Sequence, residues 1–69
     1  MQSIGETITT RRKELKITQR QLSELASVGY NTLIAVEKGQ GNPTLSVLQR
    51  ILDTLGLRII VTVKDYEES

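Results

Sequence analysis

Residues 18–39 read TQRQLSELASVGYNTLIAVEKG and carry start signals for two short helices in tandem. Thr18 can cap the first helix, while the side chain of Gln21 reaches back to the backbone N–H of Thr18 in a capping box. Ile17 and Leu22 have the spacing of a hydrophobic staple around this cap. We therefore predict a helix that begins after Thr18 and buries one stripe, formed by Leu22, Leu25 and Ala26.

The second helix of this stretch is predicted over about residues 30–37, with Leu33 and Val36 facing inward. Val28 and Leu33 again have staple spacing, here around Gly29 as the cap. Only three or four residues separate the two helices, too few for an antiparallel hairpin with room to spare. We therefore expect a tight corner between them, as in a helix-turn-helix arrangement.

Two further helices are predicted on either side of this pair. Ser3 and Glu6 form a second capping box, which starts a helix over about residues 3–15. Its stripe is Ile4, Ile8 and Leu15, with Arg12 beside it. A fourth helix ends at Leu55, and its apolar face is Leu45, Leu48, Ile51, Leu52 and Leu55. The sequence leaves its cap open: Asn42 with Pro43 at the first helical position, or Thr44.

The periodicity changes to two in LRIIVTVK, residues 57–64, where apolar and polar residues alternate except at Ile60. A β-branched run of this kind predicts a strand. The chain offers no second strand, and an unpaired apolar edge is a liability, so we expect the strand to pair with its copy in a homodimer. The alternative is a frayed or helical C-terminus. The predicted interface residues are Leu57, Ile59, Ile60, Val61 and Val63.

Together these patterns predict a mainly α protein. Residues 1–56 are expected to form a domain of four to five helices, residues 57–64 a dimerisation strand and residues 65–69 an acidic tail. A chain of 69 residues buries only about 60% of its unfolded surface, so a partner subunit would add to a thin core.

The composition argues against several function classes. The chain contains neither cysteine nor histidine, which excludes disulfides, zinc fingers and catalytic pairs based on these residues. The glycine-rich loop KGQGNPT, residues 38–44, lacks the Gly-Lys-Ser/Thr ending of a phosphate-binding loop. We therefore expect no enzyme activity, no metal and no cofactor. Without a signal peptide or membrane-spanning segment, we expect a soluble cytoplasmic protein with no membrane partner.

The charge is unevenly distributed. The whole chain has a formal net charge of +1, but residues 1–64 hold nine cations and five anions, because three acidic residues lie in the last five positions. A basic body suits a polyanionic partner. On charge alone, a solvated basic helix face is an equal alternative. The cations that cluster within ten residues are Arg11, Arg12, Lys13, Lys16 and Arg20.

Residues 11–57, RRKELKITQRQLSELASVGYNTLIAVEKGQGNPTLSVLQRILDTLGL, resemble the lambda-repressor/Cro-like (XRE) DNA-binding family. The matching features are Arg12, Thr18 with Gln19, Leu22 to Ala26, Val28, Thr32, Leu33, Val36, Glu37 to Gly39, Pro43 and the LGL of residues 55–57. The family usually has glycine where this chain has Ser27 and a hydroxyl cap where it has Gly29. Ser27 would be strained if its site requires a positive φ.

The resemblance implies that the helix over residues 30–37 enters the major groove of double-stranded DNA. Steps of about 100° place Asn31, Ile34 and Ala35 opposite the buried stripe, with Tyr30 on the flank. Asparagine can pair with adenine, and apolar groups can pack on thymine methyls. The predicted base contacts are Tyr30, Asn31, Ile34 and Ala35. Two alternatives remain: Asn31 only faces solvent, and Ile34 packs under the following loop.

Phosphate contacts are predicted at the helix start and along the flanks. Gln19 lies at the first position of its helix, where exposed N–H groups suit an anion. The resemblance implies that this glutamine also braces the recognition helix, and that Arg12 and Glu37 form a structural ion pair. The predicted phosphate contacts are Gln19, Arg20, Thr32, Lys38, Gln40 and Asn42.

A strand after the fourth helix looks like the HipB-like antitoxins within this family. The resemblance then implies a homodimeric repressor of a palindromic operator, with a HipA-like serine/threonine kinase as toxin partner. Two alternatives are a stand-alone transcriptional regulator of the same family and a protein whose main role is toxin binding.

Overall fold

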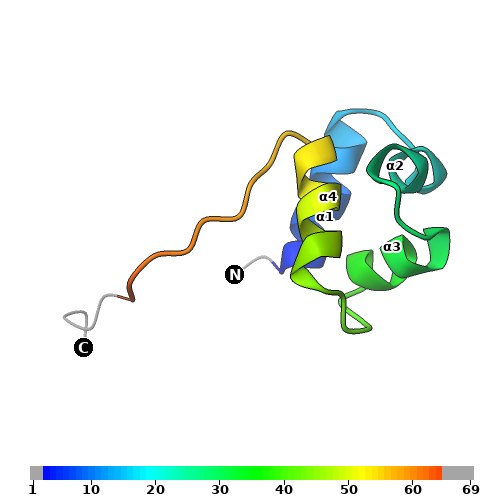
Figure 1. The fold of residues 1–69 in the computed structure, drawn as a ribbon. Coiled ribbons are helices and arrows are strands. Elements are labelled where there is room, and N and C mark those ends of the chain that lie inside the picture. The colour runs from blue at the N-terminus through cyan, green and yellow to red at the C-terminus, as the bar shows by residue number, and fades with distance from the viewer. Residues whose placement is uncertain (1–2, 65–69) are drawn as a thin grey trace.

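The computed structural model describes residues 3–64, which form a body of four helices and a C-terminal extension (Figure 1). The helices are α1 Ile4–Glu14, α2 Gln19–Ala26, α3 Tyr30–Glu37 and α4 Leu45–Thr54. The prediction of a mainly helical protein is confirmed, and the described residues contain no fifth helix. The predicted acidic tail over residues 65–69 lies outside the described part of the chain.

Capping boxes start α1 and α2 as the sequence predicts. The Glu6 backbone N–H donates to the Ser3 hydroxyl at 3.2 Å, and the Ser3 N–H donates to the Glu6 carboxylate at 2.9 Å. At α2 the corresponding distances between Thr18 and Gln21 are 3.0 and 2.8 Å. Each box satisfies two backbone donors that would otherwise lack a partner, which fixes where the helix begins.

The caps of α3 and α4 are both defined, and that of α4 decides which residue begins the fourth helix, a choice that the sequence left open. Gly29 precedes α3 as predicted and provides no side-chain cap. The Thr44 hydroxyl accepts from the Val47 N–H at 3.2 Å, so Thr44 caps α4, and the alternative of Asn42 with Pro43 is wrong. Gly56 follows the end of α4 with φ of 75°, a left-handed conformation that glycine adopts without strain.

The core lies between the helices, with α2 packed against both α3 and α4, and α1 against α3. Its fully buried side chains are Ile8, Leu22, Leu33, Ile51 and Leu55. Four of the predicted stripe residues lie outside it: Leu25 and Leu45 are 66% and 59% exposed, and Ile4 and Leu15 are 45% and 41% exposed. The structure therefore corrects the inward faces predicted for these four positions.

The geometry of α2 explains the error at Leu25. At about 100° per residue, Leu22 and Ala26 define the buried direction, while Leu25 and Ser23 lie about 80° to either side. The corner between α2 and α3 buries the flank of α2 that carries Ser23. The Ser23 hydroxyl donates to the Arg20 carbonyl at 2.8 Å. A buried hydroxyl with a backbone acceptor is tolerated, and Leu25 is left on the outer flank.

Gly5 allows α1 to approach the end of α3 closely. A Cβ atom on Gly5 would lie 2.5 Å from the Val36 carbonyl oxygen and 2.7 Å from the Glu37 carbonyl oxygen. Real carbon atoms do not approach a backbone oxygen this closely, so only glycine fits between the two helices. The contact sets the position of α3 relative to α1.

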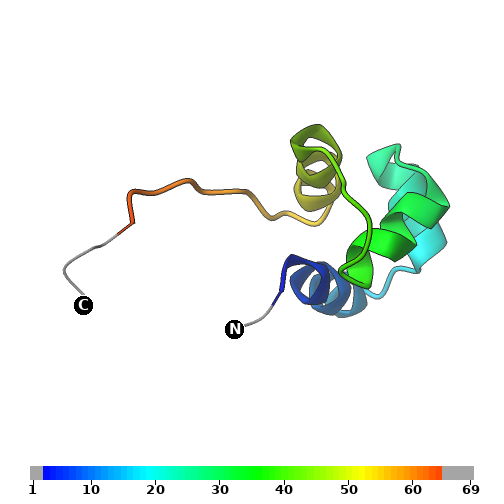
Figure 2. The same cartoon turned by 90° about the horizontal axis from the view of Figure 1, so that it is seen from below.

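Residues 57–64 form neither helix nor strand and extend away from the helical body (Figures 1 and 2). Leu57 and Ile59 pack against the core, whereas Ile60, Val61 and Val63 are 68%, 91% and 92% exposed. Both views show the extension leaving on the side opposite α2 and α3. The predicted strand is therefore not formed within the single chain, because a strand requires a hydrogen-bonded neighbour. No helix among residues 3–64 has the length and apolar character needed to cross a bilayer.

Candidate nucleic-acid interface

The corner between α2 and α3 depends on the backbone of Ser27. Its φ and ψ are 57° and 44°, in the left-handed region, as expected if this site requires a positive φ. The N–H of Ser27 donates to the Glu24 carbonyl at 3.2 Å, and the N–H of Val28 donates to the Ser23 carbonyl at 3.0 Å. This helix end turns the chain sharply, so that α3 begins at Tyr30.

One side of α3 is buried and the other is available for contact. Leu33 is fully buried and Val36 nearly so, while Asn31 and Thr32 are exposed. Within the described residues, the Asn31 side chain makes no hydrogen bond, so its amide donors and acceptor are free for a partner. Because Gly29 has no side chain, the first backbone N–H groups of α3 also lack a side-chain cap.

Ala35, and not Ile34, lies beside the loop that follows α3. The Ala35 Cβ is 3.6 Å from the position that a Cβ on Gly41 would take, and the Ala35 carbonyl accepts from the Gln40 N–H at 2.8 Å. A shallow hollow at this loop includes Thr32, Ala35 and Pro43 in its lining. Ile34 is half-buried and does not line the hollow. Ile34 and Ala35 are the two apolar residues predicted to contact bases, and Ile34 is therefore the one that the loop covers less.

An internal polar network braces α3 against α1 and α2. Arg12 Nε and Nη2 donate to the two carboxylate oxygens of Glu37 at 2.8 and 3.2 Å, and their side chains are only 11% and 5% exposed. Arg12 Nη1 also donates to the Ile17 carbonyl at 3.0 Å, and Gln19 Nε2 donates to Glu37 at 3.1 Å. The predicted ion pair is present, and Gln19 joins it.

The network sets the protonation of Glu37. Burial raises the pKa of this carboxyl, but hydrogen bonds from Arg12, Gln19 and Thr9, together with the charge of Arg12, outweigh burial and hold the pKa below its ordinary value. Glu37 is therefore ionised at neutral pH, which keeps the carboxylate as an acceptor for all its donors.

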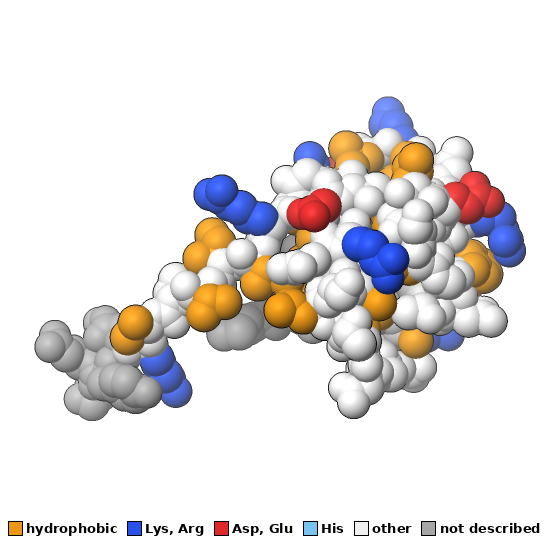
Figure 3. Space-filling model, in the orientation of Figure 1, with side chains coloured by type: hydrophobic (Ala, Val, Ile, Leu, Met, Phe, Trp, Pro, Cys, Tyr) orange, Lys and Arg blue, Asp and Glu red, His pale blue; other side chains and the backbone are white. Residues whose placement is uncertain are grey.

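The arginine-rich segment of α1 is committed largely to internal contacts. Arg11 Nε donates to the Leu55 carbonyl at 2.9 Å, at the end of α4, and Arg11 also pairs with Glu14 at 3.3 Å. With Arg12 bound to Glu37, two of the five clustered cations act inside the protein. Lys and Arg side chains lie at separate places on the visible face, rather than in one basic patch (Figure 3).

Sequence reasoning missed a contact between Arg20 and Tyr30. The guanidinium carbon of Arg20 lies 4.2 Å from the centroid of the Tyr30 ring. The two residues are ten positions apart and meet only because the corner brings the beginnings of α2 and α3 together. No local periodicity signals such a pair, although each residue was predicted separately to contact DNA.

Thr32 lies in the first turn of α3, whereas three further predicted phosphate contacts lie toward the C-terminal end of α3. Lys38, Gln40 and Asn42 are all exposed there. The loop that carries these polar residues has a left-handed backbone conformation at Gly39 and at Gly41, whose φ angles are 75° and 77°. Two groups of predicted residues thus lie at opposite ends of α3: Gln19, Arg20, Tyr30 and Asn31 at the beginnings of α2 and α3, and Lys38, Gln40 and Asn42 after the C-terminal end of α3. Thr32 and Ala35 lie between them and line the hollow at the loop.

Two short helices at a tight corner, with one helix before them and one after, define a helix-turn-helix domain. The family model described as Helix-turn-helix matches residues 8–60. The chain therefore belongs to this family, with a lambda-repressor-like fold.

Several curated relatives carry names that refer to gene regulation. The immunity repressor protein of Bacillus phage phi105 is 36% identical over 61 residues, which cover 88% of this chain and 42% of the repressor. An uncharacterised HTH-type transcriptional regulator of Methanothermobacter thermautotrophicus is 45% identical over 49 residues, 71% of each chain. Repressor protein C of Escherichia phage P2 is 36% identical over 52 residues, 75% of this chain and 52% of that protein. The chain thus spans about half or less of the two phage repressors.

Proposed function

We propose that this protein is a sequence-specific DNA-binding repressor of transcription that acts in the cytoplasm. The observation that carries the proposal is the arrangement of α3, which buries Leu33 and exposes Asn31 and Thr32 while Glu37 ties its C-terminal end to α1 and α2. A braced helix with a polar outer face suits the major groove, where preorganised side chains read base edges. The names of the phage relatives support the same function.

In this proposal the residues at the outer side of α3 read bases. Asn31 pairs with adenine, Ile34 and Ala35 contact thymine methyls, and Tyr30 flanks them. Backbone phosphates are bound by Gln19, Arg20, Thr32, Lys38, Gln40 and Asn42. Gln19 would combine this role with its hydrogen bond to Glu37, so that a phosphate contact also orients the helix that reads the bases.

The first prediction tests base reading by Asn31. A DNA duplex selected from a randomised pool by the wild-type protein serves as the probe, with a scrambled duplex of the same length as reference. Asn31→Ala should weaken binding to the selected duplex by about 1–3 kcal/mol, the value of one good bidentate base contact. Binding to the scrambled duplex should change little, and titrations of both duplexes measure the difference. Equal losses on both would show that Asn31 does not read sequence.

We further propose that the protein binds a palindromic operator as a homodimer, through α4 and residues 57–64. The exposed apolar side chains of Leu45, Ile60, Val61 and Val63 support this, because a second copy would cover them. Two α3 helices would then enter successive major grooves about 34–36 Å apart.

A finer proposal is that the protein is the HipB-like antitoxin of a toxin–antitoxin operon, with a HipA-like serine/threonine kinase as partner. The extended apolar segment after α4 supports this assignment. The names of the relatives, which are repressors and regulators, suit the alternative of a stand-alone regulator equally well. Co-purification with the product of an adjacent kinase gene separates the two. Absence of such a gene and of toxin binding would leave the stand-alone regulator.

A further inference from the structure

The contact between Arg20 and Tyr30 joins the beginnings of the two helices of the motif. Arg20 is the second residue of α2, and Tyr30 is the first residue of α3. A guanidinium 4.2 Å from a ring centroid lies well within the range of cation–π attraction. Tyr30 is partly buried, while Arg20 is exposed. The contact therefore restrains an arginine side chain that would otherwise be free in solvent.

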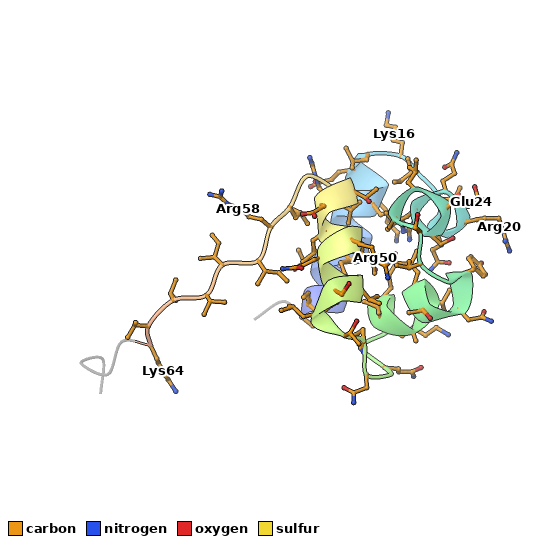
Figure 4. All side chains as sticks on the ribbon, in the orientation of Figure 1. Lys16, Arg20, Glu24, Arg50, Arg58 and Lys64 are labelled. Atoms are coloured by element: carbon orange, nitrogen blue, oxygen red, sulfur yellow. The ribbon has the colours of Figure 1, made fainter. Side chains whose placement is uncertain are left out.

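The contact with Tyr30 leaves the hydrogen-bond donors of the guanidinium without a partner. The N–H groups of arginine lie in the plane of the group, so a ring that covers one face does not block them. Within residues 3–64 the Arg20 side chain donates no hydrogen bond, and it forms no ion pair with Glu24 one turn along α2. Figure 4 shows Arg20 projecting from the body beside Glu24. The donors of Arg20 are thus close to the Tyr30 ring and unoccupied within the described residues.

We propose that Tyr30 is a positioning residue that holds Arg20 ready to bind a DNA phosphate. This inference rests on the proposed function, that α3 enters the major groove. In such a complex the helix that precedes the recognition helix crosses the DNA backbone, which places the beginning of α2 near phosphates. An arginine restrained before binding loses less conformational entropy when it binds. This inference revises the role given to Tyr30 above: Tyr30 contributes to affinity through Arg20, and base reading is left to Asn31, Ile34 and Ala35.

A double-mutant cycle tests the coupling, with the selected duplex described above as the probe. Tyr30→Leu removes the aromatic ring and should weaken binding about two- to fivefold, the equivalent of an exposed cation–π contact. In an Arg20→Ala background the same change should have almost no effect. Tyr30→Phe keeps the ring and should rescue the loss seen with leucine.

A matched control uses Lys13, an exposed cation on α1, away from the proposed dimer interface. Lys13→Ala removes one positive charge, as Arg20→Ala does, but the effects of Lys13→Ala and Tyr30→Leu should simply add. An NMR measurement without DNA provides a second readout: the Arg20 side-chain protons should be shifted upfield by the ring in the wild type and in Tyr30→Phe, and not in Tyr30→Leu. Thermal melting confirms that each variant is folded.

The outcomes separate this inference from the proposed function. If the wild type binds the selected duplex but Tyr30→Leu has the same effect with and without Arg20, the coupling is absent and the inference is wrong. A loss with Tyr30→Phe as large as with leucine would assign the role to the hydroxyl and also contradict it. A wild-type chain that binds no duplex overturns the proposed function, and this inference falls with it.

Discussion

At the scale of single residues, Ser27 adopts a left-handed backbone conformation that glycine reaches with less strain. Its φ is 57°, and the corner between α2 and α3 depends on it. For residues with a Cβ atom, this conformation costs about 1–2 kcal/mol. Glycine avoids that cost but loses more entropy on folding, which offsets part of the gain.

Ser27→Gly should therefore raise the free energy of unfolding by about 0.5–1 kcal/mol, measured by urea denaturation. The matched control is Ser46→Gly, at an exposed position in the first turn of α4. There the backbone is right-handed and glycine should instead lower stability by about 0.5–1 kcal/mol. If both substitutions destabilise the protein equally, Ser27 is not strained.

Glu37 links protonation to stability. Its pKa in the folded protein is lowered from the ordinary value of 4.5, so the unfolded state binds the proton more readily. The stabilisation from this carboxylate is fully present above pH 4.5 and is lost as the pH falls through the lowered folded pKa. The wild type should therefore lose stability more steeply than Glu37→Gln in this acidic range.

At neutral pH Glu37→Gln should lower the free energy of unfolding by about 1.5–3 kcal/mol, the range for hydrogen bonds to a charged group. The control is Glu14→Gln, because the Arg11–Glu14 pair is exposed and contributes less than about 1 kcal/mol. Denaturation curves between pH 7 and pH 3, about one unit apart, measure both effects. Parallel pH profiles for wild type and Glu37→Gln would contradict the lowered pKa.

At the scale of elements, local signals predicted the helices well because caps act within one turn. The boxes at Ser3 and Thr18 and the glycine at position 29 each lie where the sequence placed them. The side of each helix that faces the core was less predictable from the sequence. Leu25 satisfies the helical periodicity but lies on the flank that the α2–α3 corner leaves exposed. Which flank of α2 is buried depends on how α2 packs against α3 and α4. The periodicity within one helix carries no information on that packing.

Residues 57–64 provide the element-scale test of dimerisation. If the segments of two copies pair as strands, Val61→Pro removes a backbone donor from the ladder and should shift the protein to monomers in sedimentation equilibrium. Val61→Thr keeps the N–H and a β-branched side chain, so it should leave the dimer largely intact. A dimer that survives the proline substitution would show that the interface lies elsewhere, for example on α4 alone.

At the scale of the whole molecule, the candidate interface could be predicted only in part. The ion pair of Arg12 with Glu37 was expected from the family resemblance and is present. The contact of Arg20 with the Tyr30 ring was not expected, because it forms between two helices whose angle is set at Ser27. Charge counting was also incomplete: Arg11 and Arg12 raise the net charge of the body, yet both bind internal oxygens.

The exposed cations predict how DNA binding responds to salt. Phosphate binding releases counterions from DNA, so affinity should fall as salt rises, with a slope in log–log plots of about 0.9 for each phosphate contact. Lys38→Gln should reduce the slope by about 0.9 for each bound protomer, because Lys38 is exposed at the end of α3. Lys13→Gln, on α1, should leave the slope unchanged. Titrations at several salt concentrations measure the slopes, and an affinity that does not respond to salt would contradict DNA binding by this surface.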